Sequence, residues 1–173
     1  MAAGNTYTPL ATVTLSSAVA QVTFSAISGS YTDLVLVMGY RSTRTNTYAY
    51  PKITFNGDTA SNYSFTDING SATSITSSRA ANQTGFALTE GVGNTATAGI
   101  YGQFNISIQN YSNSTTFKTI LNRAGAAITN NSIAAAVGLY RSTSAITSIT
   151  IVDNNALDIM IGSTFSLYGI AAA

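Results

Sequence analysis

Residues 100–111 read Ile-Tyr-Gly-Gln-Phe-Asn-Ile-Ser-Ile-Gln-Asn-Tyr, and this stretch decides the fold. Its apolar residues at positions 100, 104, 106 and 108 share one parity, and polar residues take most of the other. Successive side chains of a β-strand point to opposite faces of the sheet, so the pattern predicts a strand with one apolar and one polar face. Such a strand needs neighbours on both edges and a second sheet over its apolar face.

Segments of the same kind fill most of the remaining chain. They alternate in polarity or are rich in β-branched and aromatic residues, and none holds the apolar period of about 3.6 residues that marks a helix. The sequence therefore predicts an all-β fold, an antiparallel β-sandwich of jelly-roll type with about ten strands. The other predicted strands cover residues 10–15, 21–27, 31–41, 48–55, 63–68, 85–90, 117–124, 133–141, 146–152 and 164–170.

The chain of 173 residues is expected to form a single domain, because this length is enough to bury a full core. Residues 1–9 are mostly small and polar, with Tyr7 and Pro9 as bulky exceptions, and we predict an extended N-terminal arm there. Residues 10–173 then form the sandwich domain. Inside it, residues 71–83 are rich in Ser, Thr and Ala, which predicts a mobile loop.

The composition excludes several classes of function. The chain has no Cys and no His, which excludes disulfides, thiol chemistry and histidine-based acid–base or metal chemistry. Charged residues make up only 8% of the chain, against roughly 25% in an ordinary soluble domain. The net charge of +1 leaves no basic stripe for nucleic acid. Such a surface offers little charge repulsion against association, which is more usual in secreted adhesins and virus particle subunits than in cytosolic monomers.

No segment predicts a membrane anchor or an export signal. No apolar run approaches the length of about 20 residues that spans a bilayer. The N-terminus lacks the basic and apolar regions of a signal peptide. We therefore expect a protein that is made in a cytoplasm and leaves it only as part of something larger.

Candidate catalytic and metal-binding residues are few. Asp153 and Asp158 are the two carboxylates nearest in sequence, but the residues between them predict a turn, where Asp normally bonds the local backbone. A glycosidase needs two carboxylates that flank a sugar, and a serine nucleophile needs a base. Asn56, Asp58 and Asn62 carry oxygen atoms of the kind that Ca²⁺ binds, although a solvated turn explains them as well. We predict a protein that is not an enzyme and uses no metal or cofactor.

The candidate binding residues are tyrosines and arginines. Exposed tyrosine favours protein interfaces and carbohydrate-binding surfaces, but tyrosines at the ends of sandwich strands give the same pattern. The tyrosines expected on polar faces or in loops are Tyr7, Tyr48, Tyr50, Tyr101 and Tyr111. Tyr40-Arg-Ser-Thr43 recurs as Tyr140-Arg-Ser-Thr143, either by coincidence or because both strand ends lie at one rim of the sandwich. The predicted interface residues are Tyr7, Pro9, Tyr40, Arg41, Arg44, Tyr48, Tyr140 and Arg141.

Residues 31–41 are apolar on both parities, with Leu34 and Leu36 on one and Val35 and Val37 on the other. Such a strand is central in its sheet, or its second face is covered by another subunit. Together with the near-neutral surface and the exposed tyrosines, this predicts a homo-oligomer, with a homotrimer as the preferred form.

A family resemblance rests on seven segments in order along the chain. They are Tyr7-Thr-Pro-Leu-Ala-Thr-Val-Thr-Leu15, Tyr31-Thr-Asp-Leu-Val-Leu-Val37, Phe55-Asn-Gly-Asp-Thr-Ala-Ser-Asn-Tyr-Ser64, Asn110-Tyr-Ser-Asn113, Val137-Gly-Leu-Tyr-Arg-Ser-Thr143, Ala145-Ile-Thr-Ser-Ile-Thr150 and Ser163-Thr-Phe-Ser-Leu-Tyr-Gly-Ile170. With these segments the chain resembles the small jelly-roll virion proteins of tailed bacteriophages. The resemblance covers nearly the whole chain and implies a particle component without catalytic residues.

Two roles are compatible with that resemblance. The first is a capsid decoration (cement) protein that binds the major capsid protein on the outer surface of the shell. The second is a tail-fibre or receptor-binding domain that recognises host surface glycans. The cement role is favoured because the chain is about one sandwich, with no stalk, coiled coil or repeat, and because an N-terminal arm suits attachment to a neighbour.

Overall fold

The computed structural model describes residues 6–129 and 131–171, and within these ranges the chain forms fourteen β-strands and no helix. The prediction of an all-β fold is therefore confirmed. The strands are β1 (Tyr7–Thr14), β2 (Gln21–Phe24), β3 (Asp33–Tyr40), β4 (Tyr48–Ala49), β5 (Pro51–Phe55), β6 (Tyr63–Ser71), β7 (Ser74–Gln83), β8 (Phe86–Ala87), β9 (Gly91–Val92), β10 (Gly102–Ile108), β11 (Lys118–Ala126), β12 (Ser132–Tyr140), β13 (Ile149–Asp153) and β14 (Thr164–Ile170).

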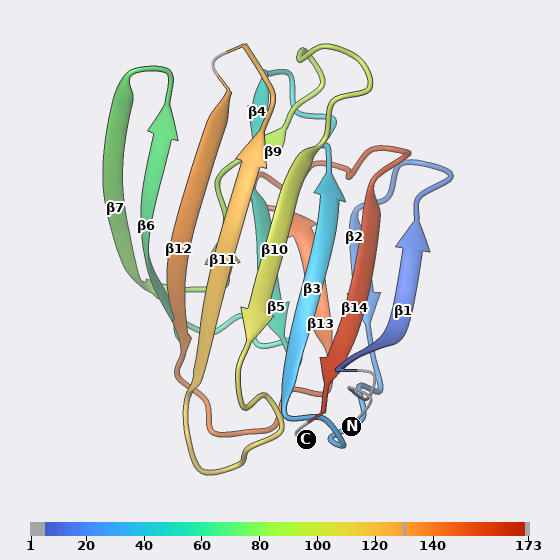
Figure 1. Ribbon diagram of the computed structural model, residues 1–173, viewed down its shortest axis with the longest axis vertical. Coiled ribbons are helices and arrows are strands. Elements are labelled where there is room, and N and C mark those ends of the chain that lie inside the picture. Colours follow the sequence, from blue (N-terminus) through green and yellow to red (C-terminus); the bar gives the residue numbers. More distant parts are fainter. Residues whose placement is uncertain (1–5, 130, 172–173) are drawn as a thin grey trace.

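Two sheets of unequal size face each other (Figure 1). The large sheet has eight strands in the order β1-β14-β3-β10-β11-β12-β6-β7, and the small sheet has four in the order β2-β13-β5-β8. β4 and β9 pair separately and lie toward the upper end of the molecule in Figure 1. Two antiparallel sheets around a shared core make a β-sandwich, as predicted. The jelly-roll connectivity stays a prediction.

The strand at residues 100–111 takes the central place that its alternation predicted. β10, which covers residues 102–108 of this stretch, lies between β3 and β11 in the large sheet. Phe104, Ile106 and Ile108 face the small sheet and are at most 2% exposed. They belong to one apolar core with residues of the small sheet such as Ile53 and Phe55. Because burial of each such side chain contributes roughly 1.5–3 kcal/mol, β10 is a main anchor of the fold.

The predicted N-terminal arm needs a correction. β1 begins at Tyr7 and pairs with β14, so Tyr7 and Pro9 belong to an edge strand of the large sheet. The register shifts between Pro9 and Ala11, as expected where a residue without an N–H interrupts the ladder at an edge. The remainder of the predicted arm, residues 1–5, lies outside the described residues.

The mobile loop predicted at residues 71–83 was wrong. This segment contains β7, the edge strand that pairs with β6. Nine of its ten residues are exposed, and Ile75 is 82% exposed. A strand with two wet faces carries no apolar alternation, so only its backbone pairing identifies it. Among residues 6–129 and 131–171 there is no helix that could serve as a membrane span.

Candidate protein interface

The large sheet has an outer face, which points away from the small sheet, and this face collects exposed apolar side chains. Eleven large hydrophobic side chains are exposed among the described residues; seven of them lie on the outer face and an eighth, Phe117, directly precedes β11. The seven are Tyr7, Val37, Ile68, Ile75, Leu121, Ile133 and Val137. Exposed apolar residues scattered singly need no explanation, but a contiguous group marks an interaction surface.

The strand register brings the central members of this group together. Leu121 on β11 lies opposite Val137 on β12, and Ile68 on β6 lies opposite Ala135 on β12. Side chains directly opposite one another on neighbouring strands lie roughly 4.5–5.5 Å apart at their Cβ atoms. Together they line an open groove of about 490 Å³ whose walls are mainly apolar. The side chains are 45–56% exposed at Leu121, Val137 and Ile68, so the groove is uncovered in this chain.

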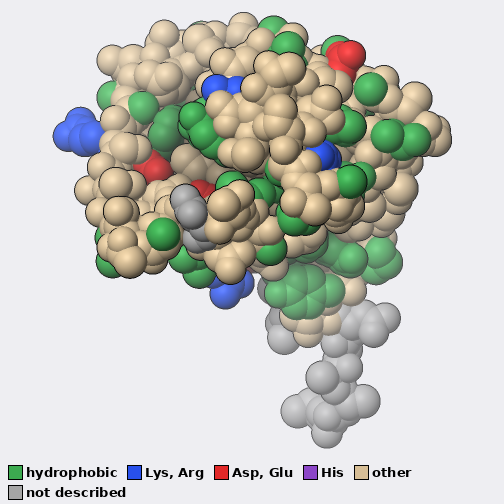
Figure 2. Space-filling model, turned by 90° about the horizontal axis from the view of Figure 1, so that it is seen from above, with side chains coloured by type: hydrophobic (Ala, Val, Ile, Leu, Met, Phe, Trp, Pro, Cys, Tyr) green, Lys and Arg blue, Asp and Glu red, His purple; other side chains and the backbone are tan. Residues whose placement is uncertain are grey.

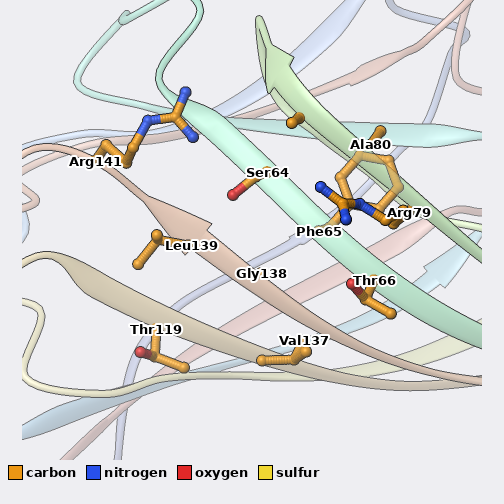
Figure 3. A pocket seen from close by; sticks show the side chains of 11 residues that line it. Ser64, Phe65, Thr66, Arg79, Ala80, Thr119, Val137, Gly138, Leu139 and Arg141 are labelled. Atoms are coloured by element: carbon orange, nitrogen blue, oxygen red, sulfur yellow. The ribbon is translucent and has the colours of Figure 1, made fainter.

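Cations surround the groove. Arg123 lies opposite Ala135 in the same row as Ile68, and Arg79 lies opposite Thr66 in the same row as Val137. Arg141 follows β12 and, with Arg79, lines a second hollow of about 460 Å³ on the same sheet (Figure 3). In Figure 3 the two guanidinium groups lie on either side of Ser64.

Among the described residues, no carboxylate side chain is exposed in the groove, and Asp158 lies in the loop after β13. Asp67, Glu90 and Asp153 are buried, and Asp58 lies in the turn after β5. Asp33, at the first position of β3, lies on the outer side of that strand but at its end, away from the groove, and accepts a hydrogen bond from the backbone N–H of Asn110 at 2.8 Å. Around the groove the outer face is therefore apolar and cationic, although the chain as a whole has a net charge of only +1. Figure 2, which looks onto one end of the molecule, shows charged side chains only in isolated places.

The repeated Tyr-Arg motif does not form one rim. Tyr40 pairs with Gly102, at the start of β10, whereas Tyr140 pairs with Lys118, at the start of β11. Since β10 and β11 run antiparallel, the two tyrosines lie at opposite ends of the large sheet. The hypothesis that both motifs build one contact surface is therefore wrong, because the intervening strands reverse the direction of the chain.

Tyr40 and Tyr140 are interior residues and not interface residues of this chain. They are 0% and 2% exposed, and each hydroxyl donates to a carboxylate: Tyr40 to Asp153 Oδ2 at 2.9 Å and Tyr140 to Asp58 Oδ2 at 3.0 Å. Burial is the main cause that raises the pKa of both hydroxyls, so both stay neutral donors. Hydrogen bonds from Asn62 and other donors in turn lower the pKa of Asp58. Tyr111, expected in a loop, is also fully buried.

Arg41 is likewise a structural residue, since it is only 5% exposed. Its guanidinium donates to four backbone carbonyls of the segment between β9 and β10, namely those of Asn94, Ala96, Thr97 and Ile100, at 2.8–3.3 Å. Arginine suits this task because its planar fork presents several donors at once. Its predicted interface role is therefore wrong in this chain.

The remaining predicted interface residues lie at the surface but in three separate places. Tyr7 and Pro9 are exposed on the edge strand β1. Tyr48 is 40% exposed at the other end of the molecule, with the Arg44 guanidinium 5.0 Å from its ring centroid. Arg141 alone borders the grooves of the outer face. The sequence thus predicted exposed tyrosines correctly at Tyr7 and Tyr48 but did not predict the apolar outer face.

A signal for the outer face was present in the sequence. Residues 31–41 are apolar on both parities, and residues 117–124 carry Phe117 and Leu121 on the parity opposite to Ile120. In the structure Val35 is 4% and Val37 36% exposed on the outer side of β3. β3 is therefore a central strand, the first of the two alternatives that its pattern allowed, and it leaves an apolar residue at its outer surface. Coverage of its second face by another subunit stays a prediction.

The side chains of the described residues form no candidate metal site. The described part of the chain holds no group of three or more His, Cys, Asp or Glu placed to share an ion. Asp58 instead accepts hydrogen bonds from the backbone N–H of Ala60 and from Asn62 Nδ2, both at 2.8 Å, as an Asp does in a turn.

Searches against family models, curated proteins and solved structures found no match to this chain.

Proposed function

We propose that this chain is a non-enzymatic structural subunit that binds another protein of its assembly through the outer face of the large sheet. The observation that carries this proposal is the uncovered apolar groove around Leu121 and Val137, bordered by Arg79, Arg123 and Arg141. Burial of this face would remove the apolar side chains from water, and the arginines would make it selective through paired carboxylates.

The partner on this face is a different protein with carboxylates beside apolar side chains. Two copies of this chain, placed outer face to outer face, would bring Arg79, Arg123 and Arg141 of each copy toward those of the other. Like charges across an interface are unfavourable, whereas complementary charges favour binding and speed encounter. Self-association is instead proposed for the edges of the large sheet, where β1 and β7 leave backbone groups unpaired by a neighbouring strand. A homotrimer closed at these edges is compatible with a free outer face.

The resemblance to phage virion proteins suggests which protein this partner is. The proposed role is a capsid decoration (cement) protein that binds the major capsid protein on the outer surface of the virion. The low content of charge, 8% of residues, supports a chain that functions inside an assembly, since it resists association poorly on its own.

Quantitative proteomics of purified particles tests this role. A cement protein stabilises the shell by mass action at many sites, so its copy number should be comparable to that of the major capsid subunit. Particles that lack the chain should release their genome at lower temperature and still adsorb to host cells. A chain present in only a few copies, whose removal abolishes adsorption, would instead be a tail-fibre or receptor-binding domain.

The second candidate, a tail-fibre domain that recognises host glycans, has one specific observation in its favour. Tyr48 and Tyr50 stand together at one end of the sandwich with ring centroids 5.5 Å apart, next to a cavity that Glu90 and Asn69 also line. Aromatic rings beside hydrogen-bonding groups are the usual components of a small-ligand site.

A further inference from the structure

The tyrosine cleft, defined by Tyr48, Tyr50, Asn69, Glu90 and Ser132, lies where the β4–β9 pair meets the end of the large sheet. β6 ends and β12 begins beside it, and Ser132 pairs with Ser71 across these two strands. The cavity has a volume of about 180 Å³. Pockets for drug-sized ligands usually measure roughly 300–1,000 Å³, so this one suits a single small ring.

The aromatic wall of the cleft is held in place before any ligand arrives. The two tyrosine rings are tilted by 59°, and the Arg44 guanidinium lies 5.0 Å from the centroid of Tyr48 and 4.9 Å from that of Tyr50. A cation over aromatic faces is attracted by their quadrupoles, which fixes the rings relative to each other. Burial raises the pKa of the Tyr50 hydroxyl, so this group remains a neutral donor. Tyr48, in contrast, keeps 40% of its surface exposed to a ligand.

The polar wall is a carboxylate with acceptor capacity left over. Glu90 is 7% exposed, and it accepts one hydrogen bond on each carboxylate oxygen, from Asn69 Nδ2 and from Ser132 Oγ. An ionised carboxylate offers about four acceptor positions. Both partners are neutral, so the buried negative charge gains from further donors.

The backbone around Glu90 is shaped to hold this arrangement. Glu90 has a φ of 75°, a conformation that a non-glycine residue rarely adopts. A Cβ at position 102 would lie 2.0 Å from the Glu90 carbonyl oxygen, so only glycine at Gly102 lets the start of β10 come so close. Strained backbone of this kind tends to occur where function requires a side chain to be placed accurately.

The combined chemistry selects the ligand. The carboxylate of Glu90 disfavours anions. Arg44 already lies as a cation over the rings of Tyr48 and Tyr50, so a second cation in the cleft would meet charge repulsion. A neutral ligand with an apolar face for Tyr48 and hydroxyl donors for Glu90 is complementary to both the aromatic and the polar wall of the cleft. We propose that the tyrosine cleft binds one neutral pyranose ring, with its C–H face on Tyr48 and adjacent hydroxyls donating to Glu90.

This inference deepens the second candidate function and rests on it only for the source of the sugar. Saturation-transfer NMR on the full chain tests the site, with glucose, galactose and N-acetylglucosamine each at millimolar concentration and tetramethylammonium as the cationic probe. At least one sugar should receive saturation on its ring protons. The Tyr48→Ala and Glu90→Gln variants should each bind it at least tenfold more weakly.

The matched control is Tyr7→Ala, which removes an exposed tyrosine of another aromatic pair, 6.3 Å from Tyr168 between ring centroids, at the opposite end of the sheet. It should bind the sugar like the unaltered chain, and all three variants should unfold at the same temperature within a few degrees. No saturation of any sugar, equal binding by Tyr48→Ala, or binding of tetramethylammonium instead would overturn the proposal. The particle copy number is measured separately, so a chain that is abundant on the shell can still bind sugar, and failure of either proposal leaves the other intact.

Discussion

The two faces of the large sheet differ less in their side chains than in what covers them. On β11 the inner face buries Lys118, Ile120 and Asn122, whereas the outer face exposes Leu121 at 45%. The small sheet closes the inner face, and no part of the described chain closes the outer one. The course of the whole chain, and not the polarity of one strand, therefore decides which face becomes core. An apolar face that the fold leaves open is then available to a partner.

The largest difference between the two faces is expected in the free energy of unfolding that is lost when an apolar side chain is removed. Ile106 is fully buried, so Ile106→Ala removes packed methyl groups and leaves a cavity, at an expected loss of about 2–5 kcal/mol in the free energy of unfolding. Leu121→Ala on the outer face should cost less than about 1 kcal/mol, because the leucine is half in water already. Urea unfolding of the isolated chain measures both. Similar losses at the two positions would mean that the outer face is covered, for example by a second copy.

Removal of a polar side chain from the inner face should instead raise the free energy of unfolding. Asn122 is 2% exposed, and neither its Oδ1 nor its Nδ2 has a hydrogen-bond partner. Asn122→Val removes both unsatisfied groups and should stabilise the chain by about 1–3 kcal/mol. The matched change Asn105→Val on the outer side of β10 should stay within about 0.5 kcal/mol. A clear loss of thermal stability in Asn122→Val would contradict this and reveal a bound water or ligand at the amide.

The buried tyrosines of the inner face predict instability in alkali. Burial raises the pKa of Tyr40 and of Tyr63, so above about pH 10 the unfolded chain loses protons that the folded chain retains. The folded state then binds more protons, and its stability falls as the pH rises, by up to about 1.4 kcal/mol per pH unit for each tyrosine. Tyr40→Phe should reduce this dependence of stability on pH by about the contribution of one tyrosine. An unchanged slope between pH 10 and pH 11, measured by urea unfolding, would refute this assignment.

Much of the fold could be predicted from the sequence, because alternation reports directly on a strand with one wet face. The inward positions of Phe104, Ile106 and Ile108 and of Phe165 and Leu167 follow from it. β7 could not be found in this way, since both of its faces are wet and only its pairing with β6 defines it.

The candidate sites were harder to predict than the fold. Tyr40 and Tyr140 share a local motif, but their burial and their positions at opposite ends of the sheet depend on distant strands. The outer face depends on register between β6, β11 and β12, which brings Ile68, Leu121 and Val137 together from well-separated segments. The tyrosine cleft similarly needs Glu90 beside Tyr48, a proximity that no spacing in the sequence indicates.

The most direct test of the proposed function asks whether the outer face is covered in the assembled particle. The chain has no cysteine, so Val137→Cys places a single thiol in the apolar groove, and Leu157→Cys places one in an exposed loop after β13 as the matched control. Maleimide labelling is then compared between the isolated chain and purified particles that carry each variant. The Val137→Cys thiol should react readily in the isolated chain and be strongly protected in the particle, while the Leu157→Cys thiol should react readily in the isolated chain. Equal labelling of Val137→Cys in both states would contradict the central claim, because the outer face would then have no partner.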